Sequence, residues 1–213
     1  DKEKLYRAEA AALTDIRRIE AEKLQRELLS HLKDLGMEKA RFEVRIDPLT
    51  EPGQNGMDRV EFMLSANPGE SLKPLEKVAS GGEMSRIMLA FKAIAANADS
   101  IPTLIFDEID TGISGHIAAV VGEKMVSIAD NHQVLCVTHL PQIAALADVH
   151  FMVQKQDDGQ TTRTSLKRLE MEERYEYIAR MMSGMEDSKL AYEHARELIT
   201  HSEEIKQKRR KNK

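Results

Sequence analysis

The first part of the chain carries apolar residues three and four positions apart on a densely charged background. Leu, Ile and Ala occupy the repeating positions over residues 1–35, and no Pro or Gly interrupts the pattern before Gly36. Such spacing predicts one amphipathic helix that ends at the glycine. At about 1.5 Å per residue this helix would reach roughly 50 Å, so we expect it to project from the domain or to pair with another helix.

The pattern then changes to alternation. Residues 41–46 and 59–65 alternate between apolar and polar side chains, and a cluster of Pro, Gly and Asn separates them. This predicts two strands joined by a loop. Helical spacing resumes directly after Gly81 and Gly82 and continues to Ala98, so we expect the next helix to begin at these glycines.

Two short apolar runs, 103–106 and 133–137, lack alternation, which is typical of parallel strands covered on both faces. Residues 117–128 between them have helical spacing. The three segments together predict a β-α-β crossover.

The last part of the pattern predicts a hairpin followed by two helices. Strand-like segments at 149–155 and 161–169 flank the turn sequence 157–159, Asp-Asp-Gly. Helical spacing follows over 171–182 and 188–201. The whole pattern is that of an α/β protein.

Composition narrows the class of protein. The 213 residues are 41% hydrophobic and 31% charged, which suits one domain of ordinary size or one domain with an appendage. No apolar run approaches the roughly 18 residues of a membrane span. The single cysteine, Cys136, excludes an internal disulfide. With no export signal at its start, the chain is expected in a reducing cytoplasm.

The net charge of −5 hides an asymmetry. Residues 206–213 carry six positive charges and no acid, so the rest of the chain is more acidic than the whole. Such a basic tail can contact phosphates electrostatically. It can equally be a solvated, frayed terminus, because a run of like charges repels itself.

Candidate chemistry lies where the two parallel strands end. The first ends in Asp107-Glu108 and the second in Thr138-His139, and ligands of open parallel sheets bind beyond these carboxyl ends. The first carboxylate can hold Mg²⁺, directly or through water, and the second can polarise an attacking water. Taken alone, the two acids also suit a solvated turn or a helix cap, and His139 suits a core or capping histidine.

A second candidate is the segment Ser80-Gly81-Gly82-Glu83 at the start of the expected helix. A hydroxyl and unhindered backbone N–H groups at a helix N-terminus favour an anion such as phosphate. The same residues also form a capping box that would start any helix. This segment, the paired acids and the histidine follow one another in this order along the chain. Together they indicate a phosphate site more specifically than any of them does alone.

These motifs resemble those of ABC-type ATPases. Residues 80–83 resemble the signature motif, 103–108 the Walker B strand, 109–115 the D-loop, and His139 the switch histidine. The longer strings 79–86, 106–113 and 137–144 are similar to the SMC-like ATPases of bacterial DNA repair, and the close match runs from about Val78 to Lys155. Ser114 departs from the pattern, because many D-loops have an aspartate there.

The resemblance implies an α/β fold: the C-terminal half of an ABC/SMC-type ATPase head, with parallel strands, helices and a β-hairpin. Residues 1–36 would be a coiled-coil helix stub, 37–205 the C-terminal lobe and 206–213 the basic tail. The sequence contains no G-x-x-x-x-G-K-[ST] loop. In SMC-like proteins that loop lies on an N-terminal half, so we expect this chain to be a fragment that is inactive alone and an ATPase in the full-length protein.

The resemblance also implies a mechanism with ATP and Mg²⁺ as cofactors. Two heads would sandwich ATP, with Asp107 organising Mg²⁺, Glu108 acting as the general base and His139 contacting the γ-phosphate. The opposite subunit would reach the same phosphate through the cofactor-binding residues Ser80, Gly81, Gly82 and Glu83. Arg86, one turn further along, is equally suited to a structural role and to contact with nucleotide or DNA.

The implied function is repair of DNA double-strand breaks in the cytoplasm, associated with the nucleoid and without a membrane. The expected partners are DNA, as double-strand ends or single strands, the protein's own N-terminal P-loop half, and a second head in a homodimer. The alternative is a non-hydrolysing module that tethers DNA or proteins. A transporter ATPase would need a P-loop upstream and no coiled coil, and the sequence offers neither.

Overall fold

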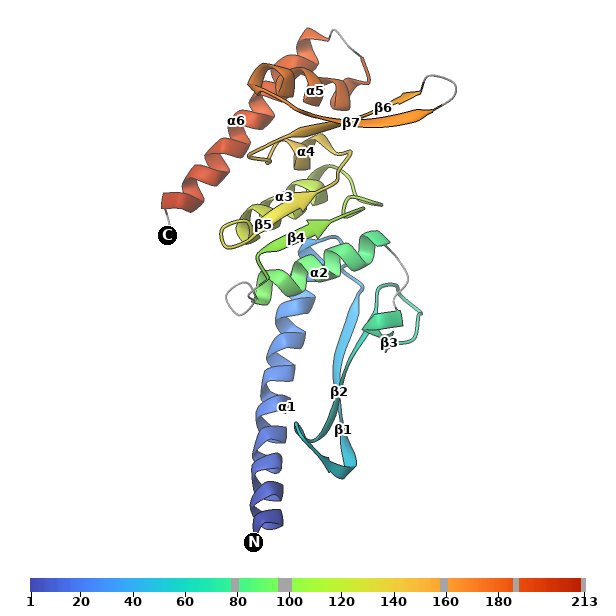
Figure 1. Ribbon diagram of the computed structural model, residues 1–213, viewed down its shortest axis with the longest axis vertical. Helices are drawn as coiled ribbons and strands as arrows, with labels where there is room; N and C mark the ends of the chain where they lie inside the picture. Colours follow the sequence, from blue (N-terminus) through green and yellow to red (C-terminus); the bar gives the residue numbers. More distant parts are fainter. Residues whose placement is uncertain (78–80, 96–100, 158–160, 186–187, 212–213) are drawn as a thin grey trace. The chain divides into compact units, whose positions relative to one another are not determined.

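The computed structural model describes residues 1–77, 81–95, 101–157, 161–185 and 188–211 (Figure 1). The chain divides into two compact units, Asp1–Ser100 and Ile101–Lys213. The division into a helix stub, a lobe and a tail stays a prediction.

The first unit begins with helix α1 (Lys2–Asp34), as the apolar spacing predicts. Gly36 adopts a φ of 78°, and the N–H of Met37 donates to the carbonyl of Leu32 over 2.9 Å. A left-handed glycine at this position closes the last turn of a helix. The predicted stop at Gly36 is therefore confirmed.

The remaining elements of the first unit are a small antiparallel sheet and one helix. The sheet has the order β1-β2-β3. Its strands are β1 (Arg41–Gly53), β2 (Gly56–Ser65) and β3 (Lys73–Pro74), followed by the 3-10 turn η1 (Leu75–Lys77) and helix α2 (Gly81–Ala95). Helix α2 begins at the glycine pair, as predicted.

The loop expected between the first two strands is mostly strand. Strands β1 and β2 pair up to Gly53 and Gly56, and the register shifts between Pro48 and Gly53. A Pro-containing segment can stay in a sheet at an edge strand and beside a bulge, and β1 has both features. Gly56, with a φ of 96°, begins β2 directly after the turn.

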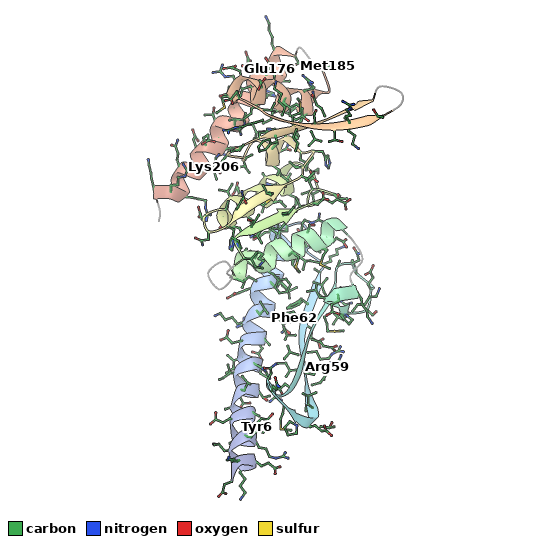
Figure 2. The ribbon with its side chains drawn as sticks, in the orientation of Figure 1. Tyr6, Arg59, Phe62, Glu176, Met185 and Lys206 are labelled. Carbon is green, nitrogen blue, oxygen red and sulfur yellow. The ribbon has the colours of Figure 1, made fainter. Side chains whose placement is uncertain are left out.

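Helix α1 does not project freely, because the β1–β2 hairpin runs along it (Figure 2). Tyr6 donates its hydroxyl to the carbonyl of Gly53 over 2.9 Å. Further along the helix, Asp58 accepts hydrogen bonds from Thr14 at 2.7 Å and from Arg17 at 3.1 Å. A hairpin of long strands can cover much of a long helix, so helix length alone does not require a second helix as partner. The expectation that this helix projects or pairs with another helix is therefore corrected where the hairpin covers α1, while α1 also contacts helix α2, and Leu5, Ile16 and Ile19 remain exposed.

Three phenylalanines fill the other end of the hairpin. Phe42 of β1, Phe62 of β2 and Phe91 of α2 lie with ring centroids 5.7 to 5.8 Å apart. Aromatic pairs at this separation add to the stability that burial alone provides. This cluster packs α2 against the sheet of the first unit.

The second unit opens with the predicted crossover. Strands β4 (Thr103–Phe106) and β5 (Gln133–Cys136) pair in parallel, with Thr103 opposite Gln133 and Phe106 opposite Cys136. Helix α3 (Gly115–Ile128) joins them. The parallel register places the carboxyl ends of both strands side by side.

A short helix, a hairpin and two longer helices complete this unit. They are α4 (Pro141–Ala144), β6 (Phe151–Asp157), β7 (Thr162–Arg168), α5 (Met171–Ser183) and α6 (Lys189–Lys211). Strands β6 and β7 are antiparallel, as predicted, while the turn residues 158–160 lie outside the described part. A capping box of Glu170 and Glu173 starts α5, and Gly184, with a φ of 68°, ends it.

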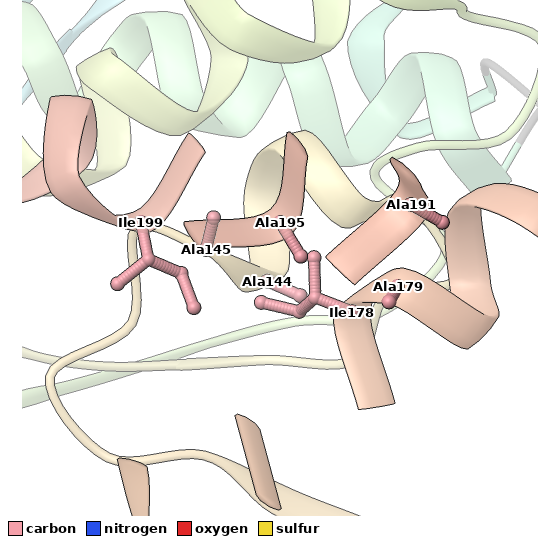
Figure 3. Packing of buried hydrophobic residues seen from close by; sticks show 7 residues of the cluster. All are labelled: Ala144, Ala145, Ile178, Ala179, Ala191, Ala195 and Ile199. Atoms are coloured by element: carbon pink, nitrogen blue, oxygen red, sulfur yellow. The ribbon is translucent and has the colours of Figure 1, made fainter. Parts of the chain in front are cut away.

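Small residues let α4, α5 and α6 approach closely (Figure 3). Their shared core consists of Ala144, Ala145, Ile178, Ala179, Ala191, Ala195 and Ile199. Residues 206–211, expected as part of a basic tail, continue α6 as helix. Within the described ranges, no helix is long and apolar enough to cross a membrane.

Candidate functional site

The two carboxylates predicted at the end of the first parallel strand lie directly after β4. Asp107 and Glu108 are both exposed. Glu108 has a φ of 55°, and it alone among the described non-glycine residues has a positive φ. The N–H of Thr111 donates to the Glu108 carbonyl over 3.0 Å, which closes a turn. A bulky residue in this region costs about 1–3 kcal/mol and tends to mark a functional position.

Asp110, two residues further, connects this turn to the end of β5. Only 3% of its side chain is exposed, and its Oδ2 atom accepts the hydroxyl of Thr138 at 2.6 Å and the backbone N–H of His139 at 2.8 Å. The same oxygen lies 3.0 Å from Nδ1 of His139. One buried carboxylate oxygen thus joins the loops that follow the two neighbouring strands.

The loop after β5 is ordered by its own hydrogen bonds. Val137 donates its N–H to the carbonyl of Phe106 over 3.0 Å, which extends the strand pairing by one residue. Leu140 donates its N–H to the hydroxyl oxygen of Thr138 over 3.0 Å, and Pro141 then starts α4. These contacts hold the backbone of His139 while 72% of its side chain stays exposed.

The carboxylates at these strand ends make the local charge negative, and this charge affects the pKa of the neighbouring thiol of Cys136. Burial, together with the charges of Asp110 and Asp107, raises the pKa of Cys136 to about 12. Both effects disfavour a thiolate. Cys136 is therefore a protonated structural residue at neutral pH, and the local potential suits a cation.

Magnesium is the cation that the resemblance implies. No cluster of three or more His, Cys, Asp or Glu side chains suited to a metal occurs among the described residues. Magnesium in nucleotide sites is commonly held by one or two carboxylates together with substrate phosphates and water. The exposed carboxylate of Asp107, at a strand end rich in negative charge, fits that mode of binding.

The predicted phosphate segment lies in the first unit. Ser80 is outside the described residues, so its part in a capping box or in phosphate contact stays a prediction. Gly81 and Gly82 form the first turn of α2 and Glu83 follows them. Because this segment and the strand ends lie in different units, their convergence on one ligand also stays a prediction.

The sequence suits Arg86 equally to a structural role and to contact with nucleotide or DNA. In the structure Arg86 is buried in α2. Burial lowers the pKa of its guanidinium, and the nearby charge of Glu83 opposes that shift. A buried position favours a structural role over contact with nucleotide or DNA. Ser114 occupies the N-cap position of α3, where its side chain makes no capping hydrogen bond.

Sequence reasoning assigned no contacts to Asp110, which the structure places between the two strand ends. It named Thr138 and His139 for their place at a strand end, but it gave no role to the third acid of the run 107–110. The available signal was its position three residues after Asp107, one turn beyond a buried strand, next to the apolar Ile109. Burial in that turn distinguishes Asp110 from the two exposed acids, Asp107 and Glu108.

The fold resembles solved structures of SMC heads. The Smc head domain with a coiled coil and joint from Pyrococcus yayanosii matches 79% of this chain and 30% of its own, with 20% identity and a TM-score of 0.54. The Smc head domain from Pyrococcus furiosus, bound to the C-terminal domain of ScpA, matches 74% of this chain and 36% of its own, with 22% identity and a TM-score of 0.50. The chain therefore has the α/β fold of SMC heads.

Within this class, the chain resembles the DNA repair protein RecN. It is 48% identical over 202 residues to RecN of Halalkalibacterium halodurans, a match that covers 93% of this chain. It is 42% identical over 214 residues to RecN of Bacillus subtilis, again over 93% of this chain. The resemblance to SMC-like DNA-repair ATPases is therefore confirmed.

The match covers only part of each RecN relative. The chain spans about a third of the length of these relatives, 36% of the first and 37% of the second, and it corresponds to their C-terminal part. No protein-family model matches the chain.

Proposed function

We propose that this chain is the C-terminal part of a RecN-like ATPase of DNA double-strand break repair and supplies half of a composite ATP site. Glu108 is the general base that activates water for attack on the γ-phosphate. His139 donates a hydrogen bond to that phosphate. Ser80, Gly81 and Gly82, with Glu83, bind the phosphate of a nucleotide held by the opposite head.

The observation that carries this proposal is the joining of two strand ends through Asp110. The turn with Glu108 and the loop with His139 are tied to one buried oxygen. A base and a phosphate contact must keep fixed positions to act on one ligand, because small displacements cost much of the rate. The positive φ of Glu108 supports the same assignment, because a solvated turn does not require a strained glutamate.

Asp107 is the residue that would hold Mg²⁺, directly or through water. When bound, the ion neutralises charge on the phosphates. The other steps belong to the protein: Glu108 takes a proton from the attacking water, and His139 keeps its ring towards the phosphate. Pairing of the heads excludes bulk water from the site.

Because each nucleotide contacts both heads, hydrolysis removes contacts that hold the heads together. This couples the chemistry to opening and closing around DNA. The partners proposed are DNA ends or single strands, the protein's N-terminal P-loop half, and a second copy of the head. The proposed compartment is the cytoplasm, at the nucleoid.

The test is reconstitution of the head. The chain is co-expressed with the N-terminal P-loop segment of a RecN relative, and ATP turnover is measured for the pair and for the chain alone. We expect turnover only from the pair. Robust hydrolysis by the pure chain would contradict a composite site.

The Glu108→Gln variant of the pair should still associate with ATP but should lose turnover. Glu123→Gln, an exposed glutamate on α3, is the matched control and should keep wild-type turnover. Turnover unchanged by Glu108→Gln would remove Glu108 from its role. Nucleotide-driven association without turnover in the wild-type pair would favour the non-hydrolysing tether.

A further inference from the structure

We infer that Asp110 is a positioning residue for His139: it fixes the ring and keeps a proton on Nδ1, so that Nε2 faces the phosphate. This inference rests on the proposed function of His139 as the γ-phosphate contact. Asp110 is buried and would act on the ligand only through His139, whereas the other proposed residues of the second unit's site are exposed.

The geometry leaves little freedom to the histidine. Oδ2 of Asp110 accepts the backbone N–H of His139 at 2.8 Å and lies 3.0 Å from Nδ1 of the same residue. The atom that accepts the backbone N–H of His139 is thus also in contact with its ring nitrogen. The hydroxyl of Thr138, at 2.6 Å, occupies a third direction around that oxygen and limits rotation of the carboxylate.

The chemistry of the pair selects the tautomer. A carboxylate accepts but does not donate, so the ring nitrogen that faces Asp110 must carry the proton. A neutral His139 therefore has its proton on Nδ1 and a bare Nε2. Only the imidazolium form carries protons on both ring nitrogens, so in that form Nδ1 donates to Asp110 and Nε2 donates to an anionic phosphate.

The exposed fractions of Asp110 and His139 fit their different roles, one in positioning and the other in phosphate contact. The side chain of Asp110 is 3% exposed and that of His139 is 72% exposed. The carboxylate is too deeply placed to meet a nucleotide itself, whereas the ring is accessible. A partner that orients a reactive histidine from behind commonly changes activity about 10- to 100-fold when it is removed.

The first experiment needs no nucleotide. The nitrogen chemical shifts of the imidazoles are recorded on the isolated chain at pH 8.5, and His139→Gln identifies the His139 signals. We expect the shift of a protonated nitrogen at Nδ1 and of a bare nitrogen at Nε2. In Asp110→Ala the proton should move to Nε2. A wild-type ring protonated mainly at Nε2 would overturn the inference.

The second experiment measures turnover in the reconstituted pair. Asp110→Ala should lower kcat about 10- to 100-fold and change KM for ATP less than about threefold. Its effect should not multiply with that of His139→Ala, because both remove the same function. Fully multiplicative losses would overturn the inference.

Two further variants separate positioning from folding. Asp110→Asn keeps the shape and an acceptor oxygen, so its kcat should lie between those of wild type and Asp110→Ala; a lower kcat than Asp110→Ala would contradict a positioning role. Asp148→Ala removes another carboxylate of the second unit and should leave kcat unchanged. If the wild-type pair shows no turnover, the proposed function fails, while the nitrogen shifts still decide whether Asp110 holds the ring.

Discussion

The ammonium of Lys206 on α6 lies 3.0 Å from Oδ1 of Asp148, a residue 58 positions earlier in the chain. The side chain of Lys206 is 5% exposed and that of Asp148 is 65% exposed. Glu203 lies 2.5 Å from the same ammonium, and Arg209 donates to Ser127 over 2.8 Å. The last turns of α6 are thus fastened to the body of the second unit (Figure 2).

Lys206→Ala should destabilise the chain by about 1 kcal/mol. The substitution removes a buried aliphatic stem and an ion pair, but Asp148 remains solvated, so the loss stays below that of a fully buried pair. Urea unfolding of the chain measures it. Lys208→Ala, at an exposed position on the same helix, should change stability by less than about 0.5 kcal/mol. Equal effects of the two substitutions would contradict a structural role for Lys206.

Contact of the C-terminal helix with DNA should depend on its exposed cations. Replacing Lys208, Arg210 and Lys211 by alanine should weaken binding and lower the salt slope by about two to three, because each phosphate contact adds nearly one to that slope. Fluorescence anisotropy with the isolated chain and labelled DNA measures both. Lys206→Ala should leave the slope unchanged. A slope that survives the triple substitution would favour a solvated terminus.

The strained backbone of Glu108 predicts an unusual response to glycine. Glu108→Gly should leave the free energy of unfolding unchanged or raise it by up to about 1 kcal/mol, because glycine adopts a positive φ without the steric cost. Asp107→Gly removes the same charge one residue earlier and should lower stability by about 0.5–1 kcal/mol. Denaturant unfolding gives the free energy of unfolding of both variants. A less stable Glu108→Gly than Asp107→Gly would contradict strain at Glu108.

The thiol of Cys136 should resist alkylation in the folded chain. Its pKa of about 12 leaves far less thiolate at pH 8 than the unfolded chain has, so iodoacetamide should react at least about 100-fold more slowly with the folded form. Asp107→Asn should speed the reaction, because the Asp107 charge helps to raise the pKa. Asp130→Asn is the control. Equal rates in folded and unfolded chains would disprove the shift.

The same shift has a consequence for stability at high pH. The pKa of Cys136 in the folded chain lies above its ordinary value of 9.0. The protonated thiol therefore makes its full contribution to the free energy of unfolding below about pH 9. It is lost as pH rises from about 9 towards 12. Cys136→Ser should flatten unfolding free energy against pH in that window, and an unaltered profile would contradict the assignment.

Much of the fold was predictable because its elements carry strong local signals. Uninterrupted helical spacing predicted α1, and the unbroken apolar runs predicted β4 and β5. The extension of the first two strands to Gly53 and Gly56 was not predictable from Pro and Gly content, because edge position and bulges are properties of the assembled sheet. The packing of α1 on that hairpin is likewise a long-range result.

The positions of the exposed candidate residues were predictable, whereas the contacts of the buried Asp110 were not. Asp107, Glu108 and His139 follow apolar strands, and that position in the chain is enough to indicate chemistry. The position of Asp110 next to the apolar Ile109, one turn beyond a buried strand, is a weak local signal that does not by itself separate it from a solvated acid. Its hydrogen bond joins it to a residue 29 positions away, and only the parallel pairing of β4 with β5 brings the two together.

Two hydrogen bonds and one contact with the ring of His139 converge on Oδ2 of Asp110, and they connect two loops. Since one atom anchors the turn that carries Glu108 and the loop that carries His139, neither loop can shift without pulling on the other. A shift of the turn after β4 would reach the loop after β5 through a single side chain, that of Asp110. A ligand that displaces one of these strand ends would therefore also act on the other.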